Sequence, residues 1–562
     1  MNIKEIVSKE IKIDGMTDKD VEKILLVPPQ KEMGDLTLPC FSLAKTFHKS
    51  PNDIALELQS NLKDCSLFRT EVVNGYLNLF LDEKYFSKLI LEDVQNNMEN
   101  YGAQNIGKGK LCLIEYSSIN VAKNPHVGHL CGTAYGESFC RMHEYFGYNV
   151  KRLNYLGDYG TQFGKVITAY KKYGSREKVL ERGVDELQDL YIKVNAECET
   201  DEELLTECRE CFLKLERGDK EIKELYDWFK EISIEEAKRI YSELEISFDD
   251  WRGESYYAQF NKETLETLNQ KGLTKRDAGA LLVDLEKYNL GKLIVEQTSG
   301  ASIYATRDLS CLVHRYDEYK YDKLLYVTGV EQEQYFQQIF QVGRLMGLDY
   351  MDQVFHFSTG RISLPTGKIS SRKGAVALIK DLFKASQEKA HAVLEEKGTN
   401  ASDIEKLEKE IGIGALIFTI LKSSSTKDSV FDLDKAISFD GETGPYLQYT
   451  YARTCSILKK AEELNLKPQI DYDSLPTQTF ALIKLFPRFK DAIYNAFIEN
   501  DPSYIARYSM NLCSEFNKLY SEMRIISEDT ILSQSLLKLV ECTNSLLKKC
   551  LYFLVMKAPE RM

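Results

Sequence analysis

The chain has 562 residues, which at about 150 residues a domain gives a prior of about four domains. Its composition, 43% hydrophobic and 28% charged, is that of an ordinary globular protein. No apolar run approaches the ~20 residues that span a bilayer, and the charged N-terminal segment lacks the apolar core of a signal peptide. We therefore expect a cytoplasmic protein with no membrane partner.

Thirteen cysteines, an odd number, suit a reducing compartment. Cys208 and Cys211, with Cys198 upstream, lack the second close pair of a zinc knuckle. They lie in an acidic stretch with helical periodicity, so thiols on a helix are favoured over a structural zinc. The net charge of −13 argues mildly against a nucleic-acid partner, although an acidic protein can carry a local basic face.

Residues 1–105 are expected to form a small α+β domain. Helical segments around a Gly break and a Pro-Pro turn are followed by the strand alternation of EVVNGYLNLFLD. The Gly-rich segment 102–110 is interpreted as a linker to the next domain.

The stretch 111–164 organises the rest of the chain. LCLIEYS has the apolar run of a buried strand, Asn124 and Pro125 are typical of a helix start, and Gly147 ends the helix near Phe146. YNVKRLNYL follows as the next strand, so this βαβ unit predicts a parallel sheet. Ligands of such sheets bind beyond the carboxyl ends of the strands, where helix N-termini present free N–H groups.

A helix-rich, highly charged segment, residues 166–289, interrupts this alternation and is interpreted as an insertion. From about 292 the alternation resumes, with strands expected in KLIVE, ASIYA, DKLLYVTG and QVFHFST. The predicted α/β domain therefore comprises residues 106–165 and 290–407. Residues 408–562 have helical periodicity throughout and predict an all-α domain rich in tyrosine and in basic residues.

His126 and His129 lie on one face of the predicted helix start. A zinc site would require an intervening Glu and a third ligand, and a core histidine would follow an apolar face; neither pattern is present. Helix N-terminal amides, two imidazole donors and nearby Lys123 favour a phosphate, and Gly128 would let a flat ring approach the backbone. On chemistry alone, an anion site and its alternatives are about equally favoured.

The loop 366–374 is the second candidate for an anion site. It places Lys368, Arg372 and Lys373 with the hydroxyls of Ser370 and Ser371 between glycines. The alternative is a solvated surface loop. Because the loop follows a strand of the resumed sheet, it can face the first helix start across the same cleft.

HVGH followed by KISSR resembles the paired HIGH and KMSKS motifs of class I aminoacyl-tRNA synthetases. HIGH alone also occurs in nucleotidylyltransferases, but the conjunction of further segments resembles the arginyl-tRNA synthetase family. Those segments are EYSSINVAKNPHVGHL, LNYLGDYGTQFG, YATRD, YVTGVEQEQYFQQ, SSRKG, GPYLQYTYAR and the terminal APERM.

The resemblance implies an arginine-tRNA ligase that uses ATP with Mg²⁺. The enzyme would form arginyl-adenylate and pyrophosphate, then transfer arginyl to the 3′ end of tRNA(Arg), with tRNA required even for activation. The fold implied is a multidomain α/β protein, in which a Rossmann-like parallel-sheet catalytic domain is split by the helical insertion. A small α+β N-terminal domain and an all-α C-terminal anticodon-binding domain would flank it. No DNA partner is expected, and we expect a monomer.

The resemblance also assigns roles in the ATP site. Catalysis would be positioning and charge stabilisation, without a side-chain nucleophile. The catalytic residues implied are His126, His129, Lys123, Lys368, Ser370 and Arg372. ATP would be bound by His126, Gly128, His129, Lys368, Arg372 and Lys373.

For the amino acid, the resemblance implies that Asp308 accepts the guanidinium fork, Tyr304 lies against its plane and Gln332 adds an amide oxygen. Glu115, Ser117 and Asn120 would hold the ammonium and carboxylate groups. The alternatives are a first-turn helix carboxylate for Asp308 and core packing for Tyr304.

In the C-terminal domain the resemblance implies an anticodon surface on which splayed bases stack on aromatic side chains. Its candidates are Tyr446, Tyr449, Tyr520 and Met562, with helix packing as the alternative for the tyrosines. Lys548, Lys549 and Arg561 are candidates for a local basic face. The N-terminal domain would contact the tRNA elbow.

The chain departs from the family pattern at a few positions. Ile119 stands where Pro is frequent, Cys131 where Arg is common and Tyr159 where Trp is common, and Ser371 is the fourth residue of the KMSKS-like motif. Lys123 would supply part of the charge missing at Ser371. Competing hypotheses are a synthetase for another amino acid, an RNA-binding paralogue without catalysis and a nucleotidylyltransferase.

Overall fold

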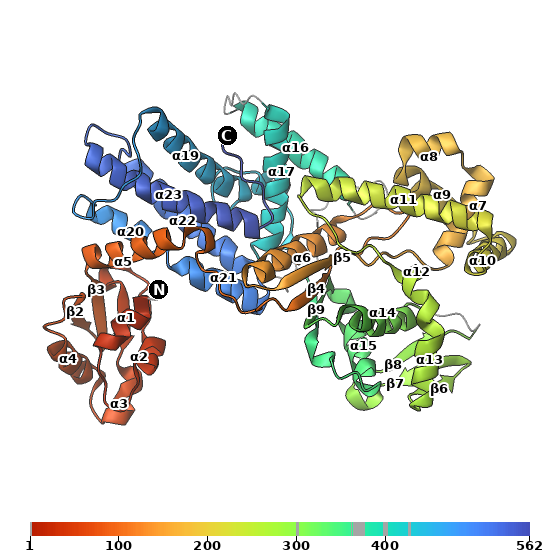
Figure 1. Cartoon of the computed structure of the whole chain (residues 1–562), viewed down its shortest axis with the longest axis horizontal. Coiled ribbons are helices and arrows are strands. Elements are labelled where there is room, and N and C mark those ends of the chain that lie inside the picture. Colours follow the sequence, from red (N-terminus) through yellow and green to blue (C-terminus); the bar gives the residue numbers. More distant parts are fainter. Residues whose placement is uncertain (1–2, 299–302, 361, 364–376, 397–402, 425–428) are drawn as a thin grey trace.

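The computed structural model describes residues 3–298, 303–360, 362–363, 377–396, 403–424 and 429–562. A small N-terminal domain and a C-terminal helical domain lie to one side of a central parallel sheet (Figure 1). Long helices and a small antiparallel sheet extend from the other side. In the part of the chain that is described, no helix is both long enough and apolar enough to cross a membrane.

The N-terminal domain is the expected α+β unit. Its antiparallel sheet has the order β1-β3-β2, and the β2–β3 hairpin turns at Asn74 and Gly75, whose positive φ values of 50° and 79° suit a type I′ turn. The elements are α1 (Ile3–Glu10), α2 (Asp18–Ile24), β1 (Leu36–Pro39), α3 (Phe41–Phe47), α4 (Pro51–Asn61), β2 (Phe68–Val73) and β3 (Tyr76–Leu81). Helix α5 (Glu83–Asn96) lies between this domain and the C-terminal helices (Figure 1), where it contacts α20 (Phe480–Ile483).

The central sheet confirms the predicted βαβ unit. Its four parallel strands have the order β10-β9-β4-β5, so β4 lies in the interior of the sheet, paired on both sides. Helix α6 (Val127–Tyr145) connects β4 to β5, and Gly147, at φ 84°, follows its C-terminal end. The strands are β4 (Leu111–Glu115), β5 (Asn149–Leu153), β9 (Lys323–Gly329) and β10 (Val354–Thr359), and the other helices are α14 (Tyr304–Tyr319) and α15 (Glu333–Leu345).

The interrupting segment contains the expected helices but also strands. KLIVE is a strand, β8 (Lys292–Glu296), yet it belongs to a separate antiparallel sheet with β6 (Thr274–Asp277) and β7 (Ala280–Asp284). The prediction of a strand in ASIYA was wrong where the structure describes it, because Tyr304 already begins α14. The helices are α7 (Thr161–Tyr173), α8 (Arg176–Arg182), α9 (Val184–Glu197), α10 (Glu202–Glu216), α11 (Lys220–Glu243), α12 (Glu254–Tyr257) and α13 (Asn261–Gln270). Cys208 and Cys211 are buried on α10, as thiols on a helix.

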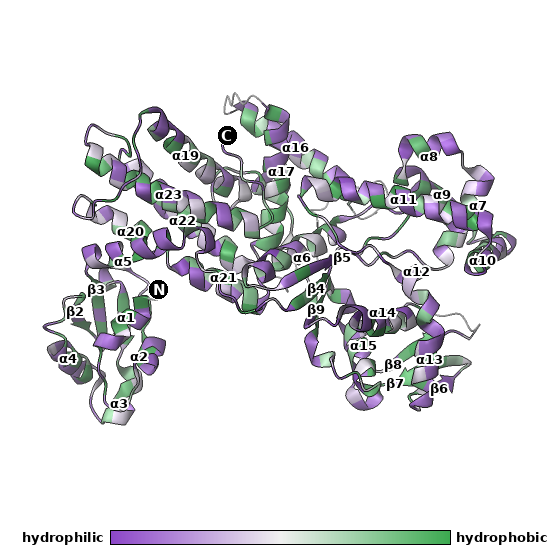
Figure 2. Ribbon diagram, in the orientation of Figure 1, coloured by the Kyte–Doolittle hydropathy of each residue, from purple (hydrophilic) through white to green (hydrophobic). Residues whose placement is uncertain are grey.

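The C-terminal part is helical, as predicted. Its central helix α17 is apolar over most of its length (Figure 2) and is packed between α16 and α19. The helices are α16 (Ile379–Glu396), α17 (Ile404–Leu421), α18 (Leu433–Ala436), α19 (Gly444–Glu463), α20 (Phe480–Ile483), α21 (Arg488–Glu499), α22 (Ser503–Glu522) and α23 (Thr530–Phe553). Two short strands, β11 (Ile362–Ser363) and β12 (Ser429–Val430), pair in parallel.

Helix α6 packs closely against Tyr116, the residue that follows β4, at the position of Gly136. A Cβ on Gly136 would lie 2.2 Å from Cγ of buried Tyr116, whereas a Cβ on Gly132, one turn earlier, would meet its nearest atoms at 3.8 Å. Gly136→Ala is therefore expected to destabilise the protein by about 1–3 kcal/mol through overpacking. Gly132→Ala is the matched control, since alanine at an open helix position is favoured over glycine by about 0.5–1 kcal/mol. Equal melting temperatures for the two variants would contradict this packing argument.

Candidate functional site

A cavity of about 730 Å³ opens at the carboxyl ends of β4 and β9. It collects residues from the first βαβ unit, from α14 and from the segment after β9. Nine of the predicted site residues line it: Glu115, Ser117, Asn120, His126, Gly128, His129, Tyr304, Asp308 and Gln332. The structure thus brings together nearly all the predicted residues that it describes in the catalytic part of the chain.

The loop between β4 and α6 has an unusual backbone. Ser117, Ser118 and Ala122 have φ values of 69°, 47° and 60°, a left-handed region that L-residues rarely adopt. Ser117 Oγ lies 2.6 Å from the Tyr241 hydroxyl of α11, and the Ala122 N–H donates to Ser233 Oγ of the same helix at 2.9 Å. Contacts with the insertion therefore hold this loop in place.

Helix α6 begins differently from the expectation. Asn124 does not cap it, because its amide donates to Asp185 and Gln188 of α9. The cap is His126, whose Nδ1 accepts the Gly128 N–H at 3.1 Å. His129 Nδ1 in turn accepts the His126 N–H at 3.1 Å. The two imidazoles thus form a capping box at the first turn, while the contacts with α9 occupy the side chain of Asn124.

These hydrogen bonds fix the chemistry of both imidazoles. Since each Nδ1 is an acceptor, each neutral ring carries its proton on Nε2. Burial, with a smaller effect of Lys123, lowers the pKa of His126, and burial together with His126 lowers the pKa of His129 to about 3. Both rings are therefore neutral N–H donors at pH 7, beside the N-terminus of a helix.

The second predicted anion motif lies outside the described residues, and with it Lys368, Ser370, Arg372 and Lys373. The segment that follows it is described: the Val127 N–H donates to Ala377 O at 2.9 Å and the Ile379 N–H donates to Pro125 O at 3.0 Å. The chain downstream of the motif is thus joined to the start of α6. Lys123 does not line the cavity, and its ammonium lies 4.8 Å from the ring centroid of Tyr191.

Another part of the cavity lining is acidic and rich in tyrosines. Asp308 Oδ1 accepts the Tyr155 hydroxyl at 2.9 Å, and Oδ2 accepts the Tyr335 hydroxyl. Asp308 is not a first-turn helix carboxylate, because the first turn of α14 holds no acidic residue. Core packing fails for Tyr304, which is 55% exposed. Gln332 ends the 3-10 helix η5 (Val330–Gln332) at the rim.

Comparison with known proteins gives the family. Family models match residues 1–81 as "Arginyl tRNA synthetase N terminal domain", 91–433 as "tRNA synthetases class I (R), catalytic domain" and 447–562 as "DALR anticodon binding domain". The arginine--tRNA ligase of Clostridium perfringens (strain 13 / Type A) is 40% identical over 100% of both chains, and that of Clostridioides difficile (strain 630) is 38% identical over 98% of both. The chain belongs to the arginyl-tRNA synthetase family. The Thermus thermophilus arginyl-tRNA synthetase structure shares the fold, with a TM-score of 0.79, 23% identity and 100% coverage of both chains.

The sequence-based interpretation missed several side chains of this synthetase cavity, among them Tyr155, Glu254 and Tyr335. Tyr155 and Tyr335 come soon after β5 and β9, where a search for polar groups beyond strand ends could have found them. Glu254 belongs to the insertion and carries no comparable signal. It pairs with Arg307 at 2.7 Å, and burial raises its pKa to about 7.

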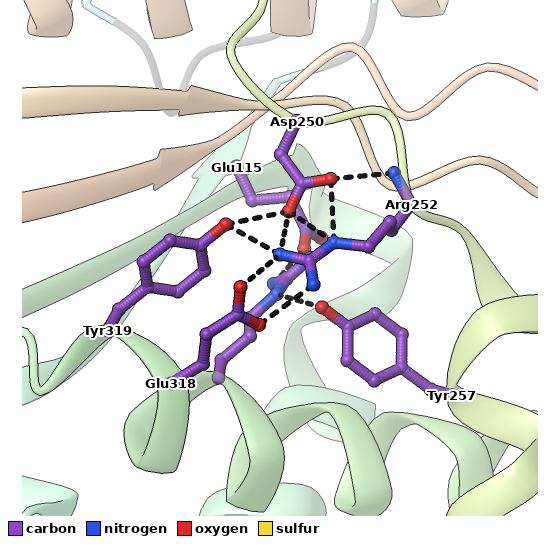
Figure 3. A network of polar contacts seen from close by, with 7 residues as sticks. Glu115, Asp250, Arg252, Tyr257, Glu318 and Tyr319 are labelled. Carbon is purple, nitrogen blue, oxygen red and sulfur yellow. Dashed lines mark hydrogen bonds and ion pairs between the residues drawn. The ribbon is translucent and has the colours of Figure 1, made fainter.

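Glu115, which lines the cavity, also belongs to a network of polar contacts (Figure 3). Its carboxylate pairs with Arg315, which is only 1% exposed and whose Nε donates to the Tyr257 hydroxyl at 3.4 Å. Burial raises the pKa of Glu115, and Arg315 opposes that shift. Beside this pair, Arg252 bridges Asp250 and Glu318. The network fixes the end of β4 against α14.

The tyrosines predicted to bind the anticodon cluster around one guanidinium. The centroids of the Tyr449 and Tyr520 rings each lie 4.8 Å from the guanidinium of Arg453, and Asn517 donates to the Tyr446 hydroxyl at 3.0 Å. Tyr520 is 42% exposed, whereas Met562 is partly buried against the core. Within this cluster the ring of Tyr520 is exposed, and those of Tyr446 and Tyr449 are half-buried.

The Glu115–Arg315 pair makes a testable prediction. Arg315→Met should destabilise the synthetase by about 3–5 kcal/mol, because it leaves a buried carboxylate without its cation. Adding Glu115→Gln should recover much of that loss. Arg276→Met is the control, since its pair with Glu296 is exposed and such pairs contribute about 0–1 kcal/mol. Thermal melting would check this order of stabilities among the three variants. A double variant less stable than Arg315→Met would contradict the prediction.

Proposed function

We propose that this chain is an arginine-tRNA ligase that works in the cytoplasm as a monomer, with no DNA or membrane partner. It activates L-arginine with ATP to arginyl-adenylate and pyrophosphate, then transfers arginyl to the 3′ end of tRNA(Arg). One observation carries the proposal: a single cavity joins two neutral imidazole donors at a helix start to an acidic recess lined by tyrosines.

The imidazole end suits the triphosphate. An oxygen of the arginine carboxylate attacks the α-phosphorus, the bond to the bridging oxygen breaks and pyrophosphate leaves, so no side-chain nucleophile is needed. The Nε2–H groups of His126 and His129 would donate to phosphate oxygens as charge builds, next to the N-terminus of α6. Because both rings are neutral, they can donate without first being protonated.

Mg²⁺ would enter with ATP. No group of three His, Cys, Asp or Glu side chains that could hold a metal occurs among the described residues. Mg²⁺ in such sites is commonly held by phosphate oxygens and water, with few protein ligands. Lys368, Ser370, Arg372 and Lys373, on the segment upstream of Ala377, would add charge over the pyrophosphate, with Lys123 nearby.

The acidic end suits arginine. A carboxylate accepts a guanidinium through two parallel hydrogen bonds, which Asp308 can offer at the end of the recess. Tyr304 would cover the guanidinium plane, and Gln332 would add an amide oxygen. Glu115, at the end of β4, and Ser117 and Asn120, on the loop that leads to His126, would hold the α-ammonium and carboxylate groups. Arginine bound in this way extends from Asp308 toward the imidazoles.

Contacts with tRNA would involve both flanking domains. Tyr446, Tyr449, Tyr520 and Met562 would form the anticodon surface, where unstacked bases meet aromatic rings. The N-terminal domain would contact the elbow of the tRNA.

The deciding experiment is aminoacylation of tRNA(Arg) with arginine, lysine, cysteine and glutamine offered separately. Only arginine should be attached. ATP–pyrophosphate exchange with arginine should require tRNA(Arg). Absence of charging with arginine would refute the proposed function, and equal exchange with and without tRNA would refute the requirement for tRNA alone.

Asp308→Asn should raise the KM for arginine by about 100- to 1,000-fold, because one partner of a desolvated charge pair is lost. The KM for ATP should change little, since Asp308 lies at the other end of the cavity from His126. Asp317→Asn, on the same helix but exposed and paired only with Lys320, is the matched control. Comparable loss of arginine and ATP binding would mean that Asp308 is structural.

A further inference from the structure

The Asp308 carboxylate is held by two phenols from different parts of the fold. Tyr155, just after β5, donates to Oδ1, and Tyr335, in the first turn of α15, donates to Oδ2. Asp308 itself lies on α14, so three elements meet at one carboxylate. Each oxygen receives one hydrogen bond from an uncharged donor, and both tyrosines line the cavity.

This arrangement leaves a definite set of acceptor sites. An ionised carboxylate offers about four lone-pair sites, two on each oxygen. One phenol on each oxygen leaves one site on each, which is the pattern that a planar guanidinium fork requires. An ammonium presents diverging donors on a compact charge and gains no second parallel bond. The two phenols therefore shape the carboxylate toward a guanidinium.

The phenols also fix the plane of the carboxylate. The terminal torsion of an aspartate is broad and roughly two-fold, so a carboxylate with one partner can rotate. Hydrogen bonds to both oxygens from separate elements hold it in one orientation. Supporting hydrogen bonds of this kind hold a binding side chain close to the orientation that its ligand requires.

Several charges face Asp308 from the surrounding elements. Burial raises the pKa of Asp308, and the hydrogen bonds from Tyr335 and Tyr155 are the largest effects that lower it. Arg307 and Arg315 add to that lowering, while the neighbouring carboxylates oppose it. The facing groups are Arg307, Arg315 and Tyr304 from α14, Glu254 from α12, Glu115 from β4, Tyr155 after β5 and Tyr335 from α15.

We propose that Tyr335 and Tyr155 are positioning residues for amino-acid specificity. Their hydroxyls orient the Asp308 carboxylate so that its remaining acceptor sites fit a guanidinium and not an ammonium. The inference rests on the proposed function, because it assumes that the recess receives the side chain of arginine. It adds two residues, from outside the predicted pocket, that act on the substrate through Asp308.

Tyr335→Phe and Tyr155→Phe test this proposal with little change in shape. Each should raise the KM for arginine by about 10- to 100-fold, the loss expected for one hydrogen bond to a charged group. The KM for ATP should stay unchanged. The inhibition constant of lysine against arginine should change far less than the KM for arginine, so discrimination between the two falls.

Tyr321→Phe is the matched control. The Tyr321 hydroxyl is buried in the same hydrophobic core and has no hydrogen-bond partner in the described structure. Its removal should leave the arginine kinetics as in the unmodified enzyme. An effect of Tyr335→Phe that equals the effect of Tyr321→Phe would overturn the proposal.

A pH profile separates positioning from general support of the fold. Loss of a phenol removes a hydrogen bond that lowers the pKa of Asp308, so that pKa rises in the variant. The carboxylate is then protonated at a higher pH, and the acid limb of kcat/KM for arginine should move to higher pH in Tyr335→Phe.

Three results would overturn the proposal: an unchanged KM for arginine, an equal rise in the KM for ATP, or an acid limb that does not move. If the unmodified enzyme failed to charge tRNA(Arg) with arginine, the proposed function would fall as well. An active unmodified enzyme with an unaffected Tyr335→Phe variant would refute only the role of the phenols.

Discussion

The site depends on a strained loop that its neighbours hold from both sides. Left-handed conformations at Ser117, Ser118 and Ala122 each cost of the order of 1–3 kcal/mol and persist only where surrounding contacts over-determine them. Here the Tyr241 hydroxyl joins Ser117 to Asn154, which in turn accepts the N–H of Ile119. The loop in this conformation connects Glu115, at the end of β4, to His126, at the start of α6. The insertion helix α11 is therefore part of the active-site scaffold, although none of the described residues that line the cavity belongs to it.

Electrostatics divides the cavity into two ends. At the imidazole end, burial lowers the pKa of His126 and of His129. Both rings are therefore neutral and present fixed Nε2–H donors. At the other end, Asp308 and Glu254 lie close together, and burial raises the pKa of both. Hydrogen-bond donors at one end and acceptors at the other match a substrate pair of triphosphate and cation.

Much of this arrangement could be predicted from sequence, because strand and helix periodicity located β4, α6, β5, β9 and β10 and therefore the strand ends. The cap of α6 could not, since Asn124 is a better local cap than His126 and only the distant contacts with α9 remove it. KLIVE has the pattern of a strand in any sheet, and the pattern does not say which sheet. Tyr155 and Tyr335 were missed because a phenol that supports a carboxylate resembles any half-buried tyrosine in sequence.

The net charge of −13 likewise says little about which surfaces could contact a nucleic acid. Carboxylates such as Glu115, Glu137 and Asp158 are paired inside the fold, where they do not repel a polyanion. Lys549, expected on a basic face, is half-buried instead. Its ammonium donates to the carbonyl of Glu99, and burial lowers the pKa of Lys549. Net charge counts all these groups equally, whereas a nucleic acid meets only those that face it. A total charge therefore cannot reveal a local surface such as the rings around Arg453.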